Sequence, residues 1–131
     1  IKKKPLVKNN KIYLYKNDFY TFKNKRTFFA MTGHVLYKKI DPVNTATHSE
    51  KLIKLIRNKI GFKNIIISDD ISMKALKYTI KKNTIKALSA GCNLILHCNG
   101  NYSEMRTVAE NSPMLDNFVI KKTSQFYNFL S

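Results

Sequence analysis

The chain has 131 residues, of which 44% are hydrophobic and 24% charged, a composition typical of one soluble globular domain rather than a disordered segment. No run of about 18 apolar residues occurs, so the sequence predicts no membrane-spanning helix. The formal charge of +16 is compatible with a nucleic-acid partner. However, only three basic residues are arginines, the side chain that best grips phosphates and bases, so we attribute most of the charge to AT-rich coding composition.

The first 26 residues are basic and carry several aromatic side chains. These are Tyr13, Tyr15, Phe19, Tyr20 and Phe22. Aromatic rings between lysines can stack on the bases of single-stranded nucleic acid. More often such rings anchor a loop or a short helix to a core, and we favour this interpretation. No apolar region follows the initial lysines, so the sequence predicts no secretory signal and a cytoplasmic location.

The segment from Thr27 to Tyr37 is apolar and rich in β-branched and aromatic residues, which predicts a buried strand and its exit loop. The stretch DPVNTATHSE then predicts a loop, because it is rich in turn-forming residues. Thr47 and Glu50 fit a capping box at the start of a helix that ends at Gly61. One face of this helix is apolar and consists of Leu52, Ile53, Ile56 and Ile60.

Two further strand–helix pairs follow. Residues 64–68 form a continuous apolar run, the pattern of a parallel strand covered on both faces. A helix is predicted from about Ser72 to Ala90, and Cys92 to Cys98 is a third predicted strand. Two cysteines are too few for a disulfide framework or a zinc site, so we expect buried free thiols. A short helix over 101–110 and a last helix within Asn117–Ser131 complete the order.

The alternation of strands and helices predicts an α/β fold with a parallel sheet. No linker or repeat divides the chain, so we expect a single domain over residues 1–131. Three strands would form an open sheet with two edges, and such edges need partners. The sequence therefore indicates a sheet from which neighbouring strands are missing.

Polar residues follow the apolar run of each predicted strand. They are Thr32, Gly33 and His34 after the first, Ser68, Asp69 and Asp70 after the second, and His97, Cys98 and Asn99 after the third. Ligands of parallel α/β folds bind at these carboxyl ends, so we expect one site there. Taken alone, His34 is more often a structural histidine, and Asp70 is a suitable N-cap. A second carboxylate beside such a cap favours a ligand, a metal or a basic partner.

Five blocks that occur in order give this chain a family resemblance. They are MTGHVLY, DPVNTATHS, IRNKIGF, IIISDDISMKA and ALSAGCNLILHCN. Over roughly residues 4–110 the chain resembles the C-terminal part of bacterial β-N-acetylhexosaminidases of glycoside hydrolase family 3. Those enzymes typically show Met-Thr-Ala-His-Val, Leu-Arg-x-x-Leu-Gly-Phe, Ser-Asp-Asp-Leu-Ser-Met and Ala-Gly-Cys-Asp.

The resemblance implies a TIM-type (β/α)8 barrel, in which the three predicted strands would be the sixth, seventh and eighth. The expected fold class is therefore the C-terminal portion of such a barrel, left incomplete. The resemblance also implies a retaining glycosidase with Asp69 as the nucleophile. Asp70 would orient the loop or cap the helix, and the sugar pocket would be lined by His34, Asp70, Ser68 and Asn99. This mechanism requires no cofactor and no metal.

Departures from the family limit this function. The Lys-His-Phe-Pro-Gly-His-Gly sugar-binding block is absent, and so is the Asp-x-His dyad that protonates the leaving group. Asn93 stands where the family often has Asp, Gly33 replaces Ala, and His48 replaces Leu. We therefore expect the isolated chain to be inactive, and to associate with itself or with a separate N-terminal barrel polypeptide.

The expected substrate is a terminal β-linked N-acetylglucosamine of cell-wall-derived glycans recycled in the cytoplasm. Two alternatives stay open. A basic nucleic-acid-binding module would explain the charge, but it explains neither the paired carboxylates nor the strand–helix order. The other alternative is a remnant without function.

Overall fold

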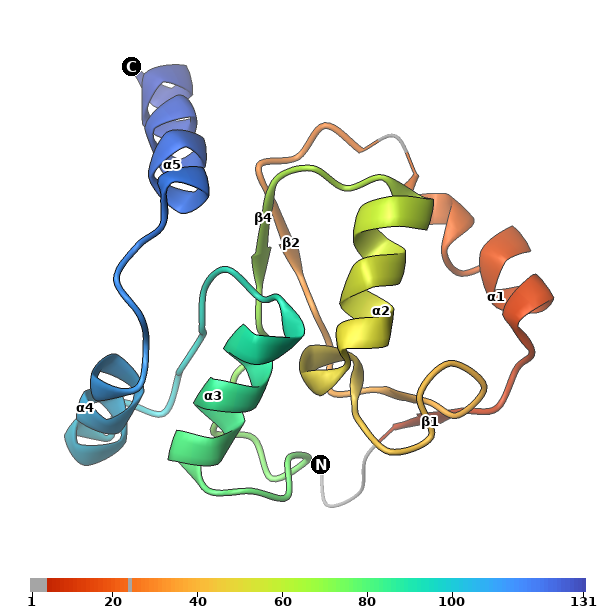
Figure 1. The fold of residues 1–131 in the computed structure, drawn as a ribbon, viewed down its shortest axis with the longest axis horizontal. Helices are drawn as coiled ribbons and strands as arrows, with labels where there is room; N and C mark the ends of the chain where they lie inside the picture. Colours follow the sequence, from red (N-terminus) through yellow and green to blue (C-terminus); the bar gives the residue numbers. More distant parts are fainter. Residues whose placement is uncertain (1–4, 24) are drawn as a thin grey trace.

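A computed structural model describes residues 5–23 and 25–131, and Figure 1 shows its helices and strands. In chain order these are β1 (Leu6–Val7), α1 (Lys11–Lys16), β2 (Phe29–Met31), β3 (Leu36–Tyr37), α2 (Glu50–Leu55), β4 (Ile65–Ile67), α3 (Ile80–Ala90), α4 (Tyr102–Glu110) and α5 (Asn117–Leu130). Short 3-10 turns lie at Tyr20–Phe22 and Ala46–His48, and a π-helical turn lies at Ile56–Ile60. Within the described ranges, no helix combines the length and the apolarity that a membrane span requires.

The strands pair in parallel, as the sequence predicts. β2 lies beside β4 (Figure 1), with Phe29 opposite Ile65 and Met31 opposite Ile67. β1 pairs with β3 in the same parallel sense. The apolar segment Thr27–Tyr37 is therefore two short strands, not one. The main chain bonds to β4 for one more residue, through Thr32 N and the Ile67 carbonyl. The side chains of Thr32 and His34 bond to Thr47 in the following loop.

The third predicted strand is an extended segment joined to β4 by a single β-bridge. Side chains take positions that main-chain groups hold in a regular ladder. The Asn93 side-chain oxygen accepts from Ile66 N at 2.9 Å, and the Ser68 hydroxyl accepts from Leu96 N at 2.9 Å. The segment still runs parallel to β4, so the predicted order holds, but a regular strand over Cys92–Cys98 was the wrong prediction.

Helix α2 is capped by Ser49 and not by Thr47. The Ser49 hydroxyl accepts from Leu52 N at 3.2 Å. Thr47 belongs to the preceding 3-10 turn, and its hydroxyl bonds to other partners, so the predicted capping box is wrong. The helix continues through the π-helical turn and ends at Gly61, whose φ of 85° is the left-handed conformation expected of a C-terminal stop.

Helix α3 begins at Ile80, later than the predicted start at Ser72. Thr79 forms its N-cap. The residues before Thr79 form turns, because the buried Asn83 amide donates to the Ile71 carbonyl and holds that loop beside α3. Propensity alone favours a longer helix, and this tertiary contact overrides it. Helices α4 and α5 lie where the sequence predicts them.

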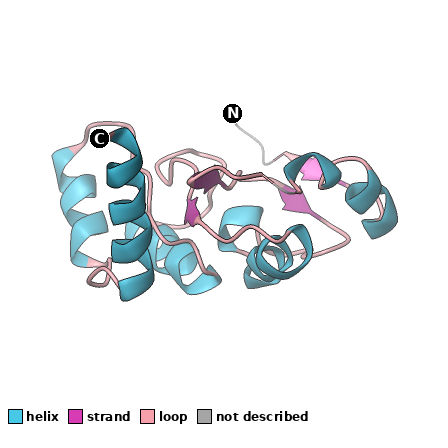
Figure 2. Cartoon of the chain, turned by 90° about the horizontal axis from the view of Figure 1, so that it is seen from above, coloured by secondary structure: helices cyan, strands magenta, loops and turns pink. Residues whose placement is uncertain are grey.

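Helix α2 lies between two apolar clusters that form the core. One cluster consists of Ile53, Phe62, Ile66, Ala87, Ala90 and Cys92. The other consists of Leu14, Phe19, Ala46 and Leu52. Figure 2 shows α2 and α3 together on one side of the strands. The two helices approach closely, since a Cβ at Gly91, where φ is 110°, would lie 2.9 Å from Ile53 Cγ2.

Aromatic rings anchor both terminal segments. Phe19 is buried and contacts Tyr15 and Tyr37 in edge-on geometry, which agrees with the anchoring interpretation of the N-terminal aromatics. Near the other end of the chain, Phe126 of α5 packs edge-on against Phe29 of β2, with ring centroids 5.0 Å apart. The first contact brings the N-terminal segment onto β3, and the second brings α5 onto β2.

The two cysteines have different environments. Cys92 is buried, as expected, whereas Cys98 is exposed, contrary to the expectation of two buried thiols. Burial raises the pKa of Cys92 to about 11, although a hydrogen bond with Thr32 and the charge of Arg57 act in the opposite direction. The Cys92 thiol is therefore protonated at neutral pH and acts as a small core group.

Arg57 fastens the amino end of β4. Its guanidinium donates to the Phe62 carbonyl at 3.1 Å, to the Asn64 carbonyl at 2.6 Å and to Asn93 Oδ1 at 2.7 Å. The same Asn93 oxygen accepts from Ile66 N. Burial lowers the pKa of Arg57, because it disfavours the charged guanidinium. Asn93 offers this charge only a neutral amide oxygen.

We expect Asn93→Asp to stabilise the fold by about 1 kcal/mol, because a carboxylate would accept the same two hydrogen bonds and add an ionic contact with Arg57. Urea denaturation at neutral pH would measure this gain. Asn9→Asp is the matched control, since it changes the net charge equally on an exposed residue. An equal gain from both variants would show that reduced self-repulsion, and not the Arg57 contact, is responsible.

Candidate functional site at the carboxyl end of β4

Asp70 ties the turn after β4 to the third polar segment. Its Oδ1 accepts from Ser72 N at 3.0 Å and from Cys98 N at 3.2 Å, and the Ser72 hydroxyl donates to the carboxylate at 2.8 Å. Partial burial raises the pKa of Asp70, but these hydrogen bonds and the charge of nearby His97 outweigh burial and lower the pKa below its ordinary value. Asp70 therefore orients the loop and does not cap α3, whose N-cap is Thr79.

Asp69 is half-buried and is held differently. Its Oδ1 accepts from Asp70 N at 2.9 Å. Its Oδ2 accepts no hydrogen bond from any residue that the structure describes. Its own N–H lies 3.4 Å from Thr32 Oγ1, a long contact. One oxygen therefore fixes the side chain while the other stays available for a reacting carbon or for a proton.

His34 lies beneath this turn and not in an open pocket. His34 is 3% exposed, and both of its ring nitrogens have hydrogen-bond partners. Nε2 lies 2.8 Å from the Asp70 carbonyl oxygen, and Nδ1 lies 2.9 Å from Thr47 Oγ1. The prediction that His34 lines the sugar pocket needs correction, because neither ring nitrogen is left for a sugar hydroxyl. The structure gives His34 the role of supporting the Asp69–Asp70 turn.

Ser68 also has a structural role instead of the predicted substrate contact. It is fully buried, and its hydroxyl accepts from Leu96 N at 2.9 Å. Its own N–H donates to the Leu94 carbonyl at 3.0 Å. Ser68 thus joins β4 to the third polar segment, and burial removes it from the residues that a sugar could reach.

Glu104 of α4 fastens the third polar segment, and sequence reasoning missed it. Its Oε2 lies 2.8 Å from His97 Nε2 and accepts from Asn99 Nδ2 at 2.6 Å. These two hydrogen bonds lower the pKa of Glu104. The signal was present in the sequence, because Asn101 caps α4 and Glu104 stands three residues later, the spacing of a capping box. Asn99 stays exposed, so the prediction that it contacts substrate remains a prediction.

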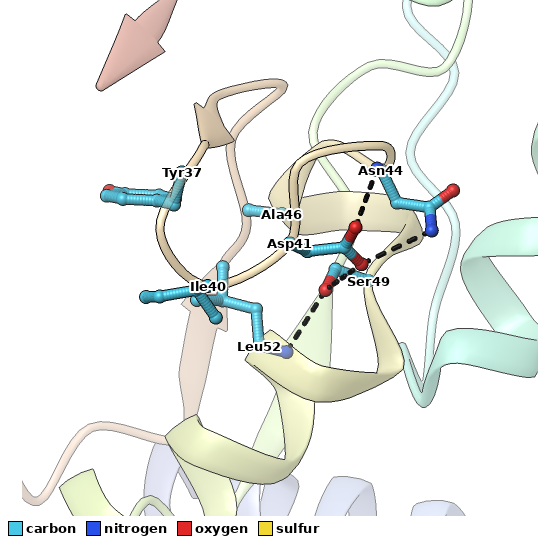
Figure 3. A pocket seen from close by; sticks show the side chains of 7 residues that line it. All are labelled: Tyr37, Ile40, Asp41, Asn44, Ala46, Ser49 and Leu52. Carbon is cyan, nitrogen blue, oxygen red and sulfur yellow. Dashed lines mark hydrogen bonds between the residues drawn. The ribbon is translucent and has the colours of Figure 1, made fainter. Parts of the chain in front are cut away.

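The loop that follows β3 is organised by Asp41. Figure 3 shows its carboxylate between Asn44 and Ser49. Oδ1 accepts from Val43 N and Asn44 N, both at 3.0 Å, and Oδ2 accepts from the Ser49 hydroxyl at 2.8 Å. These hydrogen bonds outweigh burial and lower the pKa of Asp41. The loop therefore has a fixed shape, and it delivers Thr47 to the network beneath the Asp69–Asp70 turn.

An apolar groove of about 640 Å³ runs along β2, and we call it the β2-edge groove. The three residues of β2 line it, together with Thr32 and Gly33, which follow the strand. Phe19 and Phe22 line it from the N-terminal segment, Leu55 lines it from α2, and Ile56 lines it from the π-helical turn. Asp69 and Asp70 are not among its lining residues, so the groove is separate from the carboxylate turn.

Comparisons with known sequences place these features in a family. The family described as Glycosyl hydrolase family 3 N terminal domain matches residues 2–122. A Beta-hexosaminidase of Nitrosomonas eutropha is 41% identical over 71 residues, which cover 53% of this chain and 20% of that protein. A Beta-hexosaminidase of Psychromonas ingrahamii is 30% identical over 129 residues, which cover 94% of this chain and 36% of that protein.

Solved structures agree with this match. The β-N-acetylglucosaminidase of Thermotoga maritima superposes with a TM-score of 0.72 at 31% identity, over 82% of this chain and 25% of that one. NagZ of Neisseria gonorrhoeae shares the fold, with a TM-score of 0.75 at 24% identity, over 91% of this chain and 34% of that one.

The parallel strands, the helices beside them and the carboxylate turn define an α/β chain that matches part of a glycosidase barrel. The chain belongs to glycosyl hydrolase family 3, whose N-terminal domain it matches over most of its length. It spans 20% and 36% of the lengths of the two curated relatives described above.

Proposed function

We propose that this chain carries the nucleophile of a retaining glycosidase that removes terminal β-linked N-acetylglucosamine. The observation that carries the proposal is Asp69, a carboxylate with one unpaired oxygen at the carboxyl end of β4. Asp69 would attack the anomeric carbon as the aglycone leaves, and water would then hydrolyse the covalent glycosyl-enzyme with net retention. The names of the relatives support this substrate class.

The proposal includes a division of the active site. The sugar-binding block and the Asp-x-His dyad do not occur in these 131 residues. General-acid assistance is commonly worth a factor of about 10² to 10⁴, and substrate positioning adds to it. We therefore expect that the chain alone does not hydrolyse the substrate. A second polypeptide segment must supply the general acid and the contacts with the sugar.

The β2-edge groove supports such a partner. Ile65 N donates to the Phe28 carbonyl and Thr32 N donates to the Ile67 carbonyl, so the even-numbered residues of this stretch face β4. In a parallel ladder the main-chain groups of Phe29 and Met31 then face the opposite edge, toward the groove. This edge of β2 pairs with no strand among residues 5–23 and 25–131. Such an edge beside an apolar groove is suited to the addition of one more β-strand.

We expect the purified chain to self-associate through this edge. Met31 is 64% exposed on β2, and Met31→Lys would place a charge beside the edge and shift the chain toward monomer. Sedimentation velocity at several concentrations would measure the shift. Met114→Lys, at a residue 93% exposed outside the groove, is the matched control. A wild-type chain that is monomeric throughout, or an equal effect of both variants, would contradict this expectation.

An aryl β-N-acetylglucosaminide tests the catalytic proposal. We expect no turnover by the chain alone, and turnover when it is combined with a polypeptide that carries the Lys-His-Phe-Pro-Gly-His-Gly block and the Asp-x-His dyad. If the purified chain hydrolyses the substrate unaided and Asp69→Asn abolishes this activity, the divided site is contradicted. The assignment of Asp69 as the nucleophile would then stand. An inactive mixture of folded partners would count against the function itself.

The cellular setting is part of the same proposal. We propose that the glycans derive from cell-wall fragments and that the reaction takes place in the cytoplasm. The nucleic-acid alternative makes a different prediction, namely binding to DNA or RNA with a steep salt dependence. We expect any such binding to disappear at moderate salt, because the charge is spread over lysines and no feature of the carboxylate turn would read a base.

A further inference from the structure

The hydroxyl of Thr47 lies at the centre of a buried hydrogen-bond network. Thr47 is fully buried. Its Oγ1 lies 2.9 Å from Thr32 Oγ1, 2.9 Å from His34 Nδ1 and 3.2 Å from the Gly33 carbonyl oxygen. Its carbonyl accepts from Cys92 Sγ at 3.8 Å. The Thr47 hydroxyl and the Thr47 carbonyl therefore both have hydrogen-bond partners within the protein.

The direction of each hydrogen bond follows from the acceptor at the end of the network. The Asp70 carbonyl can only accept, so His34 Nε2 carries the proton that is donated to it. In the neutral ring, His34 Nδ1 then accepts from the Thr47 hydroxyl, whose one proton is shared with the Gly33 carbonyl 3.2 Å away, and the Thr47 oxygen accepts from the Thr32 hydroxyl. The Thr32 oxygen accepts from Asp69 N at 3.4 Å. A continuous path thus runs from Asp69 N to the Asp70 carbonyl.

We propose that Thr47 is a positioning residue for Asp69, because through Thr32 and His34 it holds the backbone on both sides of the Asp69–Asp70 peptide. That this positioning serves catalysis rests on the proposed function, whereas the hydrogen bonds themselves do not. The loop that Asp41 organises places Thr47. A segment that precedes β4 in the chain therefore helps to set the direction of the Asp69 carboxylate. Asp70 adds its own clamp from the other side of the turn.

Amide hydrogen exchange of the full chain, followed by mass spectrometry, tests the proposal. Thr47→Val keeps the shape of the side chain and removes the hydroxyl, and we expect the amides of residues 69–72 to exchange about tenfold faster. Thr47→Ser restores the hydroxyl, and we expect exchange within about twofold of wild type. Amides of α4 and α5 should not change in either variant, because no hydrogen bond joins the described residues of these helices to Thr32, His34 or Thr47.

A second variant keeps the test decisive if Thr47→Val does not fold. Thr32→Val breaks the same path one step nearer to Asp69 and should give the same local acceleration. The proposal is wrong if folded Thr47→Val or Thr32→Val leaves residues 69–72 unchanged, if Thr47→Ser matches Thr47→Val, or if exchange rises equally in α5. No sugar enters this measurement, so its result is independent of whether the glycosidase proposal succeeds.

Discussion

Replacement of Asp69 by Asn is expected to lower turnover of an aryl β-N-acetylglucosaminide by at least about a thousandfold, in any preparation of this chain that shows turnover. Asn keeps the size of the side chain and an oxygen that can accept from Asp70 N. It removes the negative charge that attack on the anomeric carbon requires. We therefore expect the free energy of unfolding to stay nearly unchanged while the covalent step is lost.

Two control variants separate this effect from general perturbation. Asp18→Asn makes the same substitution at an exposed residue and should leave turnover unchanged. Asp70→Asn weakens the clamp on Ser72 and Cys98, so it should reduce turnover less than Asp69→Asn while lowering stability more. Turnover that survives in Asp69→Asn and is lost in Asp70→Asn would reverse the assignment of the nucleophile.

Replacement of Asp41 by Ala is expected to lower the free energy of unfolding by about 3 kcal/mol. Asp41 is only 7% exposed, and its removal would leave Val43 N, Asn44 N and the Ser49 hydroxyl without their acceptor. Urea denaturation at neutral pH measures the loss. Glu50→Gln, which removes a carboxylate from an exposed ion pair with Lys54 in the same region, should change stability little.

The same carboxylate gives stability a defined dependence on pH. The pKa of Asp41 is lower in the folded chain than its ordinary value of about 3.9. Its contribution to stability is therefore fully present above about pH 4 and is lost as the pH falls through the lowered folded pKa. Asp41→Ala should flatten this part of the acid limb. An acid limb of unchanged slope would show that other carboxylates, such as Asp70, dominate it.

Local patterns predicted the main course of the fold. Continuous apolar runs marked β2 and β4, and the strand–helix order implied the parallel pairing that the structure shows. The same patterns failed where a side chain replaces a main-chain partner. Asn83 holds the loop that a longer α3 would have absorbed, and Asn93 and Ser68 replace ladder groups beside the third segment. The spacing of apolar residues does not predict such side-chain hydrogen bonds.

The candidate site was predicted in part for the same reason. The carboxyl ends of neighbouring parallel strands lie together, so the grouping of Asp69 with Asp70 and the third segment followed from chain order. The roles of His34 and Ser68 did not follow, because they depend on burial and on partners distant in sequence. His34 bonds to a carbonyl 36 positions away in the sequence. The sequence predicted Thr47 as a helix cap, whereas in the structure its hydroxyl bonds to Thr32 and His34.

The two ends of β4 are held by different sets of side-chain hydrogen bonds, which has an evolutionary consequence. Arg57 and Asn93 secure the amino end, while Thr47, His34 and Asp70 secure the carboxyl end, with a three-residue strand between them. Substitutions at the amino end can therefore add to the stability margin of the fold without disturbing the carboxylate turn. That reserve would allow the turn to accumulate changes in specificity that a less stable chain would not tolerate.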